Sequence, residues 1–108
     1  MSNQGNNYIL PAFKFMNFHD MRIIDFSSTG FADSHMCLLG EYLDGNPSLY
    51  SIVLDDNPFT DISMSLLASS LKRNKSVAHI SIVNCLEVTD QGLQMMLKTV
   101  NEFNMVLF

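Results

Sequence analysis

The sequence has few basic residues and no long apolar run, and each shortage excludes a class of function. Six Lys and Arg stand against eleven Asp and Glu, for a net charge of −5. A nucleic-acid surface needs clustered basic side chains to neutralise phosphates, so we expect no nucleic-acid partner. No apolar run reaches the roughly 18 residues of a membrane-spanning helix, so we expect no membrane insertion.

Cysteine and histidine are also scarce, which limits metal, disulfide and covalent chemistry. The two cysteines, Cys37 and Cys85, and the three histidines are scattered, without CxxC or HxxxH spacing. We therefore expect no metal site, no disulfide and no cofactor. Residues 1–7 lack the basic and apolar regions of a secretory signal, which favours an intracellular, most simply cytoplasmic, location.

The remaining composition describes one folded domain, since 47% of the residues are apolar and only 16% are charged. The stretch from Leu49 to Leu71 organises it. Leu49, Ile52 and Leu54 have the spacing of inward side chains on a short strand, and Asn57 and Phe59 follow in a turn. The spacing of later apolar residues is that of a helix: Met64, Leu67 and Leu71.

This pattern occurs three times, at a shift of 28 or 29 residues. Such self-similarity predicts stacked supersecondary units. It predicts parallel strands near residues 22–26, 50–54 and 78–82, and burial of Ile52, Leu54, Leu67 and Leu71. The helix stripes predicted to be buried are Met36, Leu39, Gly40 and Leu43; Met64, Leu67, Ala68 and Leu71; and Leu93, Met96, Leu97 and Val100.

The second and third copies resemble a known family, the leucine-rich repeats. Leu49-x-x-Ile52-x-Leu54-x-x-Asn57 resembles the ribonuclease-inhibitor-like type, and Val77-x-x-Ile80-x-Ile82-x-x-Cys85 is similar to the cysteine-containing variant of F-box-linked repeats. The resemblance implies an α/β fold, a short right-handed solenoid or horseshoe arc with parallel strands on the concave side and helices on the convex side. It also implies protein binding without naming the partner.

The repeat boundaries divide the chain as follows. Residues 1–7 are expected to be a flexible tail, 8–20 an N-terminal cap, and 21–48, 49–76 and 77–105 the three repeats, with 106–108 starting a fourth strand or forming a cap. Asp33, Asp61 and Asp90 recur at the heads of the helices, where we expect them to cap free N–H groups. Gly45-Asn46-Pro47 is expected to end the first helix.

Candidate binding residues lie where the strands point outward. Parallel pairing sets these side chains in rows across the sheet. The surface they form is mixed, mildly acidic and partly apolar, which suits a protein or peptide partner. The outward candidates are Ile23, Asp25, Ser51, Val53, Asp55, His79, Ser81 and Val83.

A second candidate surface is the C-terminal run that contains Met105, Val106 and Phe108. It falls where a fourth strand begins, and its open edge invites pairing with another chain. Alternatives are a fold-back cap over the third repeat, or a truncated chain. Replacing Val106 and Phe108 by aspartate should abolish assembly with a partner while leaving the first two repeats folded.

The function predicted from the sequence is non-catalytic protein binding in a hetero-oligomeric assembly. A scaffolding subunit is the first interpretation, and a free-standing adaptor, for example ubiquitin-ligase-like, that binds through the concave face is the alternative. Asp25, Ser51 and His79 are the residue types of a hydrolase triad. A flat sheet offers them no closed pocket, so we expect no enzyme activity.

Overall fold

The structure is a computed structural model, and it describes residues 21–44 and 48–108. Strands and helices alternate along the described chain. The predicted tail 1–7, the cap 8–20 and the helix-ending residues 45–47 lie outside the described ranges. The elements are β1 (Ile23–Asp25), α2 (Asp33–Asp44), β2 (Ser51–Val53), α3 (Asp61–Arg73), β3 (His79–Ser81), α4 (Asp90–Glu102) and β4 (Val106–Leu107).

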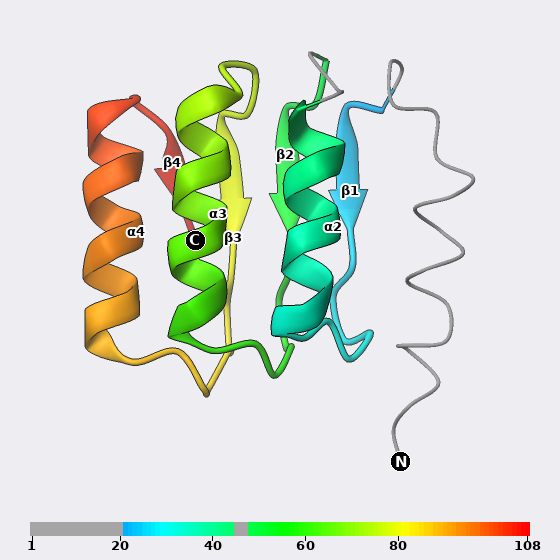
Figure 1. Cartoon of the computed structure of the whole chain (residues 1–108), viewed down its shortest axis with the longest axis vertical. Coiled ribbons are helices and arrows are strands. Elements are labelled where there is room, and N and C mark those ends of the chain that lie inside the picture. The colour runs from blue at the N-terminus through cyan, green and yellow to red at the C-terminus, as the bar shows by residue number, and fades with distance from the viewer. Residues whose placement is uncertain (1–20, 45–47) are drawn as a thin grey trace.

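The strands form one parallel sheet in the order β1-β2-β3-β4. Ile24 pairs with Ile52, and Ile52 with Ile80, as the 28-residue spacing predicts. All three helices stand on the same face of the sheet, in front of the strands in Figure 1. The predicted parallel sheet is confirmed, whereas a horseshoe arc is not: the described chain forms a small α/β domain with helices on one side.

β1, β2 and β3 are three residues long each, and the alternation of burial continues beyond them to Phe26, Leu54 and Ile82. Ile24, Ile52 and Ile80 are buried against the helices, while their neighbours along each strand are exposed or half-buried. Each strand is one residue shorter at each end than predicted. Backbone bonds still continue beyond it, for example from Phe26 N to Val53 O at 2.9 Å.

Helix packing places the core between the sheet and the helices. Ile52, Leu54, Leu67 and Leu71 are at most 1% exposed, as predicted. Two of the predicted stripe residues, both on α4, are not buried: Leu93 is half-buried, and Leu97 is 44% exposed. Its counterpart on α2 is Gly40, where an added Cβ would lie 2.8 Å from Ser70 Oγ of α3. The equivalent positions on α2 and α3, Gly40 and Ala68, are small and buried where the next helix packs, whereas no described helix packs beyond α4 to cover Leu97.

Asn57 fills the turn after β2 and joins two units. Its Oδ1 accepts from the N–H groups of Thr29 and Phe31, at 3.1 and 3.0 Å. Its Nδ2 donates to the carbonyls of Phe26, Leu54 and Asp55. A buried amide that pairs both its donor and its acceptor satisfies the backbone groups that the turn releases.

Cys85 occupies the same position in the next unit, and Thr29 in the preceding one. The Cys85 thiol lies 3.2 Å from Leu54 O, and burial raises its pKa. Thr29 Oγ1 donates to Phe26 O at 2.6 Å. A thiol with a raised pKa is a poor nucleophile, so Cys85 is placed as a structural residue of the turn.

The aspartates at the helix heads do not act as the sequence suggested. The N-cap residues of α3 and α4 are Thr60 and Thr89, and each aspartate is the first helical residue. Asp33 instead accepts from the next unit, from Thr60 N at 2.9 Å and Thr60 Oγ1 at 2.7 Å, and also from Ser63 Oγ. The prediction that it caps its own helix is wrong, because its side chain extends sideways to the neighbouring helix.

Asp61 repeats this contact one unit further along. It accepts from Thr89 N at 2.8 Å and from Thr89 Oγ1. Gly92 has no side chain, and the Asp61 carboxylate fills the space beside it. The equivalent residue beside Asp33 is the small Ser63, which donates to that carboxylate. Burial raises the pKa of Asp33, but the hydrogen bonds from Ser63 and Thr60 outweigh it and hold this pKa below its ordinary value.

Candidate functional site

The face of the sheet that the helices leave uncovered, here called the outer face, holds the predicted outward residues. The register sets Ile23, Ser51, His79 and Val106 in one row across the four strands. Ile23 is 60% exposed and Val106 is 44% exposed, whereas Ser51 and His79 are half-buried. Aliphatic exposure at both ends of one row gives this face an apolar character that a partner could cover.

An aromatic row crosses the same face. The ring of His79 lies 4.8 Å from that of Tyr50 and 6.3 Å from that of Phe108, edge to face in both cases. The Arg22 guanidinium lies 5.8 Å from the centre of the Tyr50 ring. Tyr50 is 40% exposed and Phe108 is 62% exposed. Large amphipathic rings of this kind are enriched in protein interfaces.

Tyr50 and Arg22 were not predicted as site residues. Each precedes its strand by one residue, and strict alternation assigns that position to the inward face. The chain has not yet entered the regular pleat there, so the side chain is free to turn outward. The available signal was an aromatic residue directly before the outward Ser51.

The acidic side chains of this face are held by turn backbone. Asp25 accepts from Ser27 N at 2.9 Å, and hydrogen bonding by Ser27 holds the pKa of Asp25 below its ordinary value. Asp55 Oδ1 accepts from Ser81 Oγ at 2.6 Å and from Val83 N at 2.8 Å. These hydrogen bonds fix both carboxylates in place, which puts acidic side chains at the C-terminal end of the strands.

The triad residue types do not assemble as a triad. Within residues 21–44 and 48–108, no hydrogen bond joins His79 to Ser51 or to Asp25. His79 packs between two rings, and the Asp25 carboxylate is bound to Ser27. Val53, Ser81 and Val83 complete the predicted outward set, with Val83 51% exposed.

The predicted C-terminal residues lie beside this face. Val106 N donates to Ala78 O at 2.8 Å and Phe108 N to Ile80 O at 2.9 Å, so β4 completes the sheet. Met105 is half-buried against the core. Phe108 reaches the aromatic row through its contact with His79, so Val106 and Phe108, but not Met105, form one continuous surface with the outward strand candidates.

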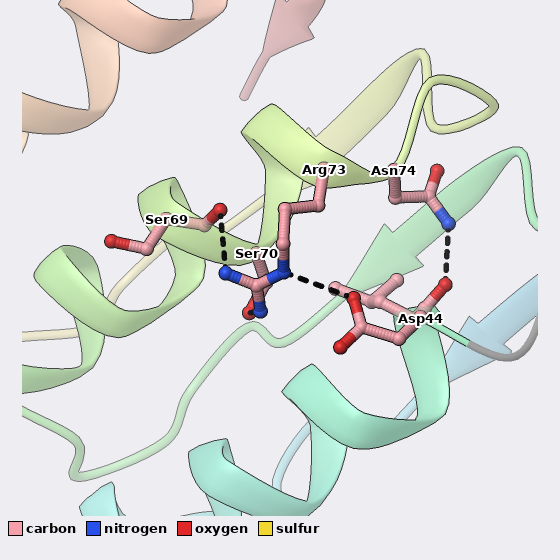
Figure 2. Close-up of polar contacts among 6 residues, drawn as sticks. Asp44, Ser69, Ser70, Arg73 and Asn74 are labelled. Carbon is pink, nitrogen blue, oxygen red and sulfur yellow. Dashed lines mark hydrogen bonds and ion pairs between the residues drawn. The ribbon is translucent and has the colours of Figure 1, made fainter.

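The helix side offers a different feature, a groove of about 270 Å³ between α2 and α3. Figure 2 shows Arg73 crossing from α3 to Asp44, with 3.2 Å between Nε and Oδ1. Arg73 and Lys72 also lie in the last turn of α3, where their positive charge interacts favourably with the negative end of the helix dipole. Both side chains of the ion pair are about half exposed, so this pair contributes little to stability.

Other chemistry is not evident in the described part of the chain. Cys37 and Cys85 are both free, one exposed and one buried. No cluster of His, Cys, Asp or Glu able to hold a metal occurs among residues 21–44 and 48–108. The Asn74 side-chain amide donates to Leu43 O at 2.7 Å (Figure 2). None of the helices in these ranges has the length and apolar character needed to cross a membrane.

Comparison with known proteins shows where this fold has been seen. No protein-family model matches the sequence, and no curated protein matches it. A solved structure titled leiomodin-1 actin-binding site 2 matches with a TM-score of 0.79 at 15% identity, over 99% of this chain and 67% of that one. A Caenorhabditis elegans tropomodulin C-terminal domain matches with a TM-score of 0.69 at 13% identity, over 94% of this chain and 80% of that one.

These findings correct the family assignment. The resemblance to ribonuclease-inhibitor-like and F-box-linked leucine-rich repeats was wrong, since the structural neighbours are tropomodulin-type domains and the sheet topology does not show a solenoid. The quoted residues define a strand, a tight turn and a helix at fixed spacing. That pattern specifies local geometry and does not determine the family. At these identities the likeness shows a shared fold, a compact α/β domain with a parallel sheet.

Proposed function

We propose that the chain is a non-catalytic protein-binding module that engages its partner through the outer face. The observation that carries this proposal is the aromatic row of Tyr50, His79 and Phe108 on a sheet whose helices all lie on the other side. Exposed Ile23, Val83 and Val106 extend the apolar area around it. Rigid rings bounded by fixed carboxylates give both contact area and directional polar contacts.

The continuity of this surface bears on how the module works. The scaffold interpretation uses the C-terminal residues, and the adaptor interpretation uses the outward strand residues. Because Phe108 packs on His79, one partner covering the outer face also covers Val106 and Phe108. This contact supports a single binding surface. The acidic net charge of −5 favours a protein over a nucleic acid as the partner, and we infer that the module works in an intracellular hetero-oligomeric assembly without inserting into a membrane.

Actin is the first candidate partner to test, because the leiomodin-1 structure with the same fold is titled an actin-binding site. The purified chain would be sedimented with actin filaments and, separately, titrated with actin monomers in fluorescence anisotropy. Saturable binding in either assay supports actin as the partner. Absence of binding in both removes actin and leaves the outer face to be tested with other purified partners.

The surface itself is tested by a charge substitution with a matched control. The doubly substituted Val106→Asp, Phe108→Asp chain should lose binding, because two carboxylates would replace the apolar edge of the surface. Ile62→Asp is the control, since Ile62 is 63% exposed and lies on α3 on the opposite side of the sheet. Circular dichroism would confirm folding. Undiminished binding by the double variant, or equal loss in the control, would refute the outer face as the site.

A further inference from the structure

A repeated contact joins each unit of the fold to the next, and it uses the same positions both times. The first residue of one helix, Asp33 or Asp61, accepts both the N–H and the hydroxyl of the threonine at the next helix N-cap. Three residues after that threonine stands a small residue, Ser63 or Gly92, against the same carboxylate. The contact thus recognises Thr-x-x-Ser or Thr-x-x-Gly at a helix start.

Asp90 holds the corresponding position on α4, yet no N–H or hydroxyl of residues 21–44 and 48–108 donates to its carboxylate. It is exposed, whereas Asp33 and Asp61 are half-buried by their partners. α4 and β4 are the last helix and the last strand of the sheet order, so their far side faces no other described element (Figure 1). We call this surface the α4 side and define it by Asp90, Leu97 and the free edge of β4 at Leu107.

The first unit is built differently at its own helix start. Ala32 precedes Asp33 where threonine stands in the other units, and its N–H donates to His35 Nδ1 at 2.9 Å. His35 is 7% exposed and occupies the position of Ser63 and Gly92. This unit therefore offers neither a free N–H nor a hydroxyl at its helix start. A second copy of the chain stacked head to tail would not supply the donors that the Asp90 carboxylate lacks.

Leu97 restricts which helix can pack against the α4 side. Gly40, the equivalent residue of α2, lets Ser70 of the next helix approach closely. Leu97 is 44% exposed and would fill that space. A helix packed beside α4 must therefore leave a gap for the leucine side chain, which then becomes an apolar anchor in the contact.

We propose that the α4 side binds a helix of another polypeptide that begins with a Ser or Thr N-cap and has Ser or Gly three residues later. Asp90 accepts the N-cap N–H and hydroxyl, as Asp33 and Asp61 do within the chain. The negative charge of Asp90 also meets the positive end of the incoming helix dipole. This surface is separate from the outer face, since Asp90 lies at the head of a helix and the helices stand on the other side of the sheet.

The test uses the whole chain and a synthetic peptide of its own residues 58–74, which carries Thr60 and Ser63. Binding of the labelled chain would be followed by nuclear magnetic resonance, which detects weak association of a short helix. Peptide should shift the signals of residues 90–97 and of Leu107. Because the bond to the carboxylate is charge-assisted, Asp90→Asn in the chain, or Thr60→Val in the peptide, should weaken binding about tenfold or more. Leu97→Ala in the chain should strengthen it, since Ser70 of the peptide gains room.

The outcomes separate this proposal from the outer-face proposal. Val53→Asp alters the outer face and should leave peptide binding unchanged, while Asp90→Asn should leave binding of the outer-face partner unchanged. The proposal is overturned if the peptide fails to bind both the native and the Leu97→Ala chains. The proposal is also overturned if the peptide binds with the same affinity after Asp90→Asn in the chain and after Thr60→Val in the peptide. The carboxylate would then not be the acceptor.

Discussion

Replacing Asn57 by alanine would remove the side chain that joins the first two units at their turns. Asn57 is 4% exposed, and its amide makes five hydrogen bonds to backbone groups. In the Asn57→Ala variant, the N–H groups of Thr29 and Phe31 would lose their acceptor in a region that water barely reaches. Each stranded buried donor costs about 1–3 kcal/mol, so we expect a loss of about 3–5 kcal/mol.

That loss is large for a domain of this size, whose whole stability is about 5–15 kcal/mol. Urea unfolding followed by circular dichroism measures it as a fall in the midpoint concentration. Asn57→Cys is the informative second variant, because cysteine stands at this position in the next unit. A thiol cannot replace the Oδ1 acceptor for two N–H groups, so this variant should lose nearly as much as alanine.

Asn101→Ala is the matched control, since Asn101 is exposed on α4 and its side chain makes no hydrogen bond with the described residues. Its stability should change by less than about 0.5 kcal/mol. The reasoning fails if Asn57→Ala loses less than about 1 kcal/mol, or if Asn57→Cys keeps native stability. Either result would mean that the turn backbone finds other partners at no cost.

Three further predictions concern the core, pH and turn geometry. Leu67→Ala should destabilise the fold by about 2–5 kcal/mol in urea unfolding, and a loss below about 1 kcal/mol would contradict its buried placement. Burial holds the pKa of His35 below its ordinary value of 6.5, so the unfolded chain binds a proton first and stability should fall as pH drops below about 6.5. In His35→Gln, which can still accept from Ala32 N, that component should disappear from the difference between unfolding midpoints at pH 7 and pH 5. Ser28 has a φ of 55°, so Ser28→Gly should raise stability by up to about 1 kcal/mol, whereas Ser34→Gly within α2 should lower it by a similar amount.

The sequence by itself determined the elements and their register. Apolar residues that alternate and then recur at helical spacing, three times at a shift of 28 or 29 residues, favour the one arrangement that buries most of them. Ile52 and Leu67 therefore lie where their pattern placed them. Asn57 was also readable, because an amide directly after a buried strand can pair the backbone groups released in the turn. The family was not determined, since such spacing specifies local geometry that unrelated sequences can share.

Tertiary structure alone decided which side chains meet between units. The direction of the Asp33 carboxylate depends on where the next helix lies, so the sequence predicted a cap on its own helix and the structure shows a bond to Thr60. The aromatic row likewise depends on how Tyr50 turns before its strand begins, and on β4 bringing Phe108 beside His79. These contacts join residues about one unit or more apart, and their geometry exists only when the strands have paired and the helices have packed.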